Sequence, residues 1–107
     1  MIRYLKPNDF DNWSDLYKDY ADFYKVPMNT EILDAVWGWI HDKNHVVKGI
    51  CFELEEKIVG IAHYRAMPRP LKGQYMGFLD DLFVEPNYRG QKIANNTGFD
   101  LYELKGD

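Results

Sequence analysis

The chain has little cysteine, no long apolar run and no excess of positive charge. Cys51 is the only cysteine among 107 residues, so no disulfide can form within the chain. No stretch approaches the roughly 20 consecutive apolar residues of a membrane helix. The first six residues also lack the apolar centre of a signal peptide. We therefore expect a reducing, cytoplasmic setting and no membrane partner.

The charge and the histidines exclude two further classes of function. A formal net charge of -4 argues against binding nucleic acid by neutralising its phosphates. An acidic balance suits a cationic small molecule, although many proteins are mildly acidic for solubility alone. His41, His45 and His63 are scattered over a helix end, a loop and a strand, without other ligands at metal-site spacing. We expect no nucleic-acid partner and no metal.

Apolar and aromatic residues, by contrast, are abundant. They make up 46% and 16% of the sequence, which is too much for a disordered chain. The length suits one domain, residues 1–107.

Two stretches have the periodicity of amphipathic helices. The first lies between Asn8, which can cap a helix, and Pro27, which ends one. The second follows a cap at Asn29 or Thr30 and closes at residues 41–44. Their predicted apolar faces are Phe10, Trp13, Leu16, Tyr17, Tyr20, Phe23 and Tyr24, and then Ile32, Leu33, Val36, Trp37 and Ile40.

The rest of the chain has the alternation of strands. A turn is predicted at Glu55 and Glu56 and a loop at residues 67–73. The predicted strands are residues 2–6, 46–55, 57–64 and 75–84. This order predicts an α+β fold, an antiparallel twisted sheet with two N-terminal helices packed on it.

Residues 79–94, Leu-Asp-Asp-Leu-Phe-Val-Glu-Pro-Asn-Tyr-Arg-Gly-Gln-Lys-Ile-Ala, carry the strongest functional signal. They predict a buried strand, a turn at Pro86 and a second turn, containing Gly90, where a helix can begin. Backbone N–H groups of such a turn bind phosphate oxygens, and Arg89 and Lys92 add positive charge. The alternatives are an ordinary strand–turn–helix junction, or an unrelated module that binds a phosphorylated ligand there.

This segment resembles the acetyl-coenzyme A motif of the GNAT acetyltransferases, Arg/Gln-x-x-Gly-x-Gly/Ala after a strand that ends in Val. Arg89 fills the first position and Ala94 the last, whereas Lys92 stands where the family usually has glycine. The strand at residues 79–84 is similar to the Leu-Glu/Asp-Asp-aromatic-Phe-Val strand of small-amine and polyamine acetyltransferases. The resemblance covers residues 1–94, the N-terminal part of the GNAT fold.

The resemblance implies acetyl-coenzyme A as cosubstrate and a small-molecule amine as acceptor. Asp80 matches the acidic residue that receives the amine proton, through water, and is the implied catalytic residue. Asp81 and Tyr64 would help to bind the substrate. For both carboxylates the alternative is a structural role, and for Tyr64 it is packing. The implied cofactor-binding residues are Leu82, Phe83 and Val84 for the pantetheine arm and Arg89, Gly90, Gln91, Lys92, Ile93 and Ala94 for the pyrophosphate.

The resemblance also implies elements for which residues 95–107 leave too little room. Residues 97–105 resemble the closing strand of the family, so we expect an internal deletion near residues 95–97, or a missing piece of sequence. The fourth strand would then expose an apolar edge. We therefore expect a homodimer, and exchange of the strand at 99–104 is one way to form it.

Two hypotheses about the function follow. The leading one is an N-acetyltransferase that transfers acetyl from acetyl-coenzyme A to a primary amine, either of a polyamine-like small molecule or of a lysine side chain. The alternative is a catalytically inactive, shortened GNAT fold that serves as a coenzyme A-binding or dimerising module. Trp37 and Trp39 cannot both point inward on one helix, so one of them is expected to line the amine pocket or a dimer contact.

Overall fold

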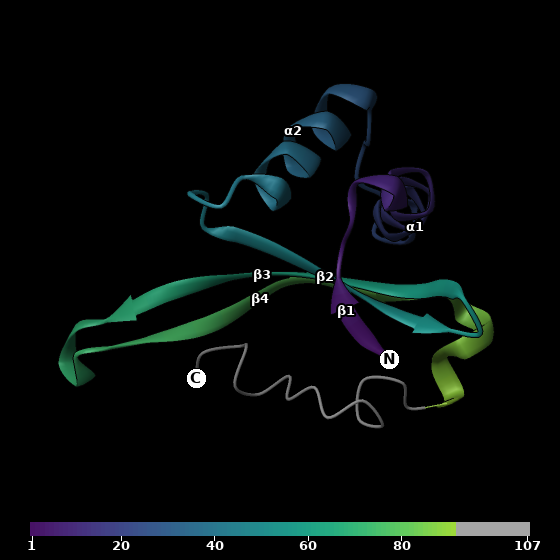
Figure 1. Ribbon diagram of the computed structural model, residues 1–107. Coiled ribbons are helices and arrows are strands. Elements are labelled where there is room, and N and C mark those ends of the chain that lie inside the picture. The colour runs from purple at the N-terminus through teal and green to yellow at the C-terminus, as the bar shows by residue number, and fades with distance from the viewer. Residues whose placement is uncertain (92–107) are drawn as a thin grey trace.

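The computed structural model describes residues 1–91, which form two helices packed on a four-stranded antiparallel sheet. Figure 1 shows both helices on the same side of the sheet. The helices are α1 (Phe10–Phe23) and α2 (Thr30–His41), and the strands are β1 (Ile2–Tyr4), β2 (Val47–Leu54), β3 (Lys57–Arg69) and β4 (Gln74–Val84). Short 3₁₀ turns occur at Pro7–Asp9 (η1), Pro70–Lys72 (η2) and Pro86–Gln91 (η3). The predicted α+β fold is confirmed.

The start of α1 differs from the prediction. Asn8 does not cap the helix but lies inside η1, and it is the Asp9 carboxylate that accepts a hydrogen bond from the Lys6 backbone N–H at 2.7 Å. The same carboxylate accepts two hydrogen bonds from Arg3, at 2.8 and 3.1 Å. Asp9 therefore ties the helix entry to β1.

The end of α1 also differs, since the helix stops well before Pro27. Lys25 has a left-handed backbone with φ of 58°. Its N–H donates to the Asp22 carbonyl at 3.0 Å, and the Val26 N–H donates to the Ala21 carbonyl at 2.8 Å. These two bonds form a Schellman motif, which satisfies the last carbonyls of the helix. The stop signal is therefore a backbone geometry and not the proline.

The predicted helix faces are confirmed except at the end of the first helix and the start of the second. Trp13, Leu16, Leu33 and Val36 are buried, and the Asn29 side chain caps α2 by accepting from the Ile32 N–H at 2.8 Å. Three residues of the predicted faces are exposed, namely Phe23 at 62%, Tyr24 at 60% and Ile32 at 39%. The first two lie at the end of α1, where the chain turns away.

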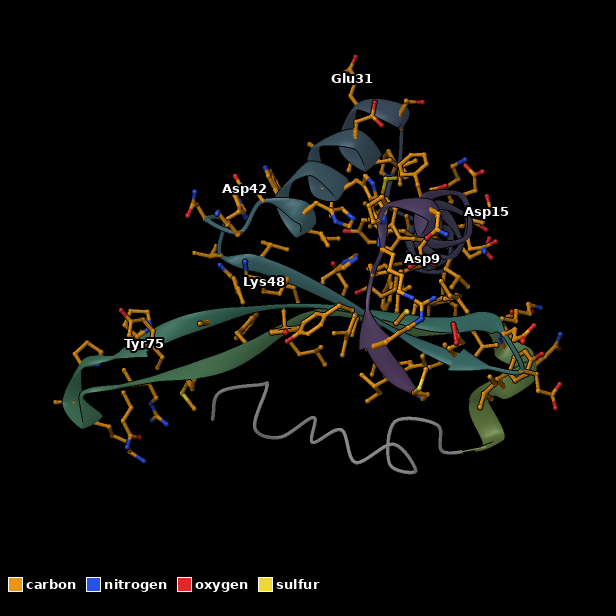
Figure 2. The ribbon with its side chains drawn as sticks, in the orientation of Figure 1. Asp9, Asp15, Glu31, Asp42, Lys48 and Tyr75 are labelled. Carbon is orange, nitrogen blue, oxygen red and sulfur yellow. The ribbon has the colours of Figure 1, made fainter. Side chains whose placement is uncertain are left out.

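The β2–β3 hairpin turns at Glu55 and Glu56, as predicted, with φ values of 50° and 65°. The second hairpin is longer than predicted, because residues 67–69 are part of β3 and not of a loop. Pro68 lies opposite Tyr75 in β4. Beyond Arg65, β3 no longer pairs with β2, so Pro68 is on an edge and removes no ladder hydrogen bond there. Figures 1 and 2 show this hairpin extending past the helices, with Tyr75 near its far end.

Apolar side chains fill both faces of the sheet. On the helix side, Trp13 and Leu16 pack with Cys51, Ile61 and Phe83, among others. On the other side, the buried residues are Ile50, Phe52, Val59 and Ala62. Within residues 1–91, neither helix combines the length and the apolar content needed to cross a lipid bilayer.

Candidate active site

The carboxylates of Asp80 and Asp81 lie at an irregularity in the pairing of β3 with β4. His63 is opposite Asp81 and Tyr64 is opposite Leu79, so Asp80 is an extra residue in β4, a β-bulge. In a regular strand two successive side chains point to opposite faces of the sheet. Here both Asp80 and Asp81 line one cavity. The bulge therefore brings two carboxylates to the same site.

The cavity measures about 410 Å³, within the usual range of small-molecule sites. It lies on the helix side of the sheet and receives side chains from both helices, from the segment before β2 and from β3 and β4. Its lining residues are Tyr17, Val36, Trp39, His45, Val46, Val47, His63, Arg65, Asp80 and Asp81. Apolar, acidic and basic groups are thus all represented.

A buried chain of hydrogen bonds positions Asp81. The indole N–H of Trp13 donates to Nε2 of His63 at 2.9 Å, and Nδ1 of His63 lies 2.9 Å from Oδ2 of Asp81. Because an indole nitrogen can only donate, Nε2 must be the acceptor and the imidazole proton resides on Nδ1. His63 is therefore neutral and donates to the Asp81 carboxylate. Trp13 is fully buried and His63 is 1% exposed, so the hydrogen bond between these two side chains is shielded from water.

The Asp81 carboxylate is held in its ionised form. Burial by itself raises the pKa of this carboxylate, but its interaction with His63, and then hydrogen bonds from Tyr17 and Tyr20, outweigh burial and lower the pKa below its ordinary value. The Tyr17 hydroxyl donates to Oδ2 at 3.1 Å. Burial, and then the charge of Asp81, raise the pKa of Tyr17 well above its ordinary value. Tyr17 therefore stays a donor, and Asp81 carries a negative charge at neutral pH.

Asp80 faces a cation of the neighbouring strand. Nε of Arg65 lies 3.2 Å from Oδ1 of Asp80, which is an ion-pair distance, although its N–H is not aligned for a hydrogen bond. The Arg65 guanidinium also lies over the Phe78 ring, with 5.0 Å between the guanidinium carbon and the ring centroid. The two side chains of the ion pair are 43% and 28% exposed, so solvent screens the attraction. The Asp80 carboxylate remains accessible from the cavity.

Trp39 and His45 both line the cavity, and their rings pack against each other. Their rings are stacked, with centroids 4.9 Å apart and an angle of 3° between the planes. Nδ1 of His45 accepts a hydrogen bond from the Val47 backbone N–H at 3.1 Å, so this nitrogen carries no proton. Trp37 instead packs against the core beside Trp13. The expectation that only one tryptophan of α2 points into the core is confirmed.

The residues expected to bind the cosubstrate lie at the end of β4 and just after it. Leu82 and Val84 pack on the far face of the sheet, whereas Phe83 is buried on the helix side. Arg89, Gly90 and Gln91 are in η3, so the backbone after Pro86 is a 3₁₀ helix. Lys92, Ile93 and Ala94, and the strand at 99–104 expected to exchange between two chains, lie outside the described residues. The homodimer stays a prediction.

The structure does not bring Tyr64 to the cavity. Tyr64 packs on the opposite face of the sheet, in the cluster around Phe52 and Ala62, whereas its neighbours His63 and Arg65 line the cavity. Sequence reasoning missed Arg65, Tyr17 and His45. The alternation along β3 was the available signal, since residues 61, 63 and 65 share one face and 63 lies opposite Asp81.

Comparisons with known proteins agree with this architecture. The sequence model of the GNAT acetyltransferase family matches residues 13–96. Among solved structures, the chain is similar to a ribosomal-protein-alanine N-acetyltransferase from Brucella melitensis biovar Abortus 2308, at 19% identity and a TM-score of 0.71, covering 97% of this chain and 66% of that one. A possible acetyltransferase from Clostridium difficile 630 has 17% identity and a TM-score of 0.75, with 92% and 65% covered. An aminoglycoside 6'-N-acetyltransferase from Acinetobacter haemolyticus has 15% identity and a TM-score of 0.65, with 91% and 65% covered.

The chain thus spans about two thirds of the length of these three solved relatives, and at such low identities the likeness establishes the fold alone. The family match is a separate observation and covers more than half of the chain. On this match and this fold, the chain belongs to the GNAT family of acetyltransferases, whose members use acetyl-coenzyme A as the acetyl donor.

Proposed function

We propose that the protein transfers the acetyl group of acetyl-coenzyme A to a primary amine of a small molecule. The observation that carries the proposal is the bulge in β4, which presents Asp80 and Asp81 side by side in a cavity of about 410 Å³. A pair of carboxylates beside apolar walls suits an ammonium group that must be held and then deprotonated. Family membership supplies the acetyl donor.

The cosubstrate would lie along β4. Its pantetheine arm would pair with the backbone at Leu82, Phe83 and Val84, the positions that follow the two carboxylates directly. Its pyrophosphate would bind at residues 89–94, which follow β4 in the sequence. This arrangement brings the thioester to the bulge, so the acetyl carbon and the amine meet next to Asp80.

The two carboxylates would have different tasks. Asp81, ionised and fixed by His63 and Tyr17, attracts the ammonium group electrostatically. Asp80 accepts one proton from it, through a water molecule, and passes that proton to solvent. This step frees the nitrogen lone pair for attack on the thioester.

The transfer then balances as follows. The amine nitrogen attacks the carbonyl carbon, a C–N bond forms, and the C–S bond breaks with its electron pair on sulfur. The second proton of the nitrogen goes to the departing thiolate, directly or through water. The products are the acetamide, free coenzyme A thiol and the proton released at the start.

Release of the coenzyme A thiol tests the proposal. The change Asp80→Asn should lower kcat/KM by about 100-fold or more, because a positioned general base typically contributes that much. The control is Asp15→Asn, the same chemical change on an exposed residue of α1 that points away from the sheet in Figure 2. It should leave the rate unchanged. The proposal is wrong if acetyl-coenzyme A binds in calorimetry and no primary amine causes thiol release, or if Asp80→Asn is as active as the parent.

A further inference from the structure

The charges that line the cavity indicate which kind of amine can bind there. This inference rests on the proposed function. We propose that the acceptor is a small amine with a single positive charge and an apolar, preferably aromatic, body. A polyamine, which the sequence resemblance favours, would fit less well.

The cavity carries one net negative charge within the described residues. Two carboxylates, Asp80 and Asp81, and one guanidinium, that of Arg65, line it. The two lining histidines add nothing, because Nε2 of His63 accepts from Trp13 and Nδ1 of His45 accepts from the Val47 N–H. One ammonium group neutralises this cavity. A second one would leave an excess positive charge in a partly apolar space, which is unfavourable.

The apolar part of the cavity favours a substrate with an apolar group, which a linear polyamine lacks. Val36, Val46 and Val47 line it together with Trp39, which is 43% exposed and whose ring is stacked on His45. An aromatic ring can pack against these apolar and aromatic side chains while its ammonium group reaches the carboxylates. An alkyl diamine would place a charged end against the same surface.

Arg65 is the residue that sets the charge balance. It lies within ion-pair distance of Asp80 and is held by Phe78. The change Arg65→Gln removes the positive charge and leaves two carboxylates without a cation. The net charge of the lining then changes from -1 to about -2. This variant should therefore shift the preference toward a dication.

The experiment compares 2-phenylethylamine with butane-1,4-diamine as acetyl acceptors for the full chain. We expect kcat/KM to favour 2-phenylethylamine by about tenfold or more, as one unbalanced, partly buried charge commonly costs. Arg65→Gln should reduce this ratio about three- to tenfold. Trp39→Ala should lower kcat/KM more for 2-phenylethylamine than for the diamine, whereas Trp39→Phe, which keeps a ring, should retain the preference.

The outcomes separate this inference from the proposed function. If the parent acetylates butane-1,4-diamine as well as or better than 2-phenylethylamine, the substrate class is wrong while acetyl transfer stands. If neither amine is acetylated, calorimetric titration with the two amines in the absence of acetyl-coenzyme A still measures which of them the cavity binds more tightly. Tighter or equal binding of the diamine in that titration overturns the inference, and tighter binding of 2-phenylethylamine supports it.

Discussion

The buried hydrogen bond between Trp13 and His63 can be tested by the change Trp13→Phe. Phenylalanine keeps an aromatic ring at the centre of the core but removes the Trp13 N–H, the one donor to Nε2 of His63 within residues 1–91. Because His63 is 1% exposed, water cannot replace that donor without opening the core. The imidazole would be left with an unsatisfied Nε2. Nothing would then fix the imidazole proton on Nδ1, the nitrogen that donates to Asp81.

The expected loss of stability has two parts. An unsatisfied buried acceptor costs about 1–3 kcal/mol. The missing part of the indole leaves a small cavity, which adds about 1 kcal/mol. We therefore expect the free energy of unfolding to fall by about 2–4 kcal/mol, a large share of the 5–15 kcal/mol typical of a folded domain.

Urea denaturation monitored by circular dichroism measures this loss, and Trp37→Phe is the matched control. Trp37 packs beside Trp13, with ring centroids 4.7 Å apart, and belongs to the same core cluster. Trp37→Phe removes the same atoms as Trp13→Phe but leaves the bond to His63 in place. It should therefore lower the free energy of unfolding only by the contribution of the cavity. The reasoning is refuted if both variants lose the same free energy, or if ¹⁵N NMR of the parent finds the imidazole proton on Nε2.

Three further predictions concern the scaffold. Hydrogen bonds from Arg3 lower the pKa of Asp9, so Asp9→Asn should lower the free energy of unfolding by about 1–3 kcal/mol at neutral pH. Urea titrations measure this difference from the parent, which should shrink as the pH falls below about 4. An unchanged difference at acid pH would contradict this sign. Burial raises the pKa of the Cys51 thiol to about 11, so a thiol reagent at about pH 8 should label it slowly in the native protein and rapidly in urea. Equal labelling rates would contradict the burial of Cys51 in the core. A methyl group at Gly60 would overlap the Phe52 ring, so Gly60→Ala should cost about 1–3 kcal/mol. At Gly38 an added methyl group would meet no side chain and no packed backbone of the described residues within 4 Å, so Gly38→Ala should stabilise α2 by about 0.5–1 kcal/mol. Equal effects of the two changes would refute the contrast.

Local sequence signals predict most of the fold. The cap at Asn29, the turn at Glu55 and Glu56 and the order of the elements follow from side-chain type and periodicity. The end of α1 could not be predicted in this way. It depends on a left-handed backbone at Lys25, a residue type that gives no hint of that conformation. Pro68 was misleading for a related reason, since proline is tolerated in a strand only where the neighbouring strand has already ended.

The candidate site was predicted in its residues more than in its geometry. The sequence identifies Asp80 and Asp81, but strict alternation would place them on opposite faces of the sheet. Only the bulge, which depends on the pairing of two strands, brings them together. The role of His63 was hidden for the same reason, because its partners Trp13 and Asp81 come from α1 and β4, 50 and 18 residues away in the chain.

The most direct test of the whole account is a crystal structure of the full chain with a bisubstrate analogue, in which coenzyme A is joined to 2-phenylethylamine through an acetyl linker. The account predicts that the amine nitrogen lies beside the carboxylates of Asp80 and Asp81, that the ring rests on Trp39, and that the pantetheine arm follows β4 from Leu82 to Val84. An analogue bound with its amine on the other face of the sheet, near Tyr64, would contradict it.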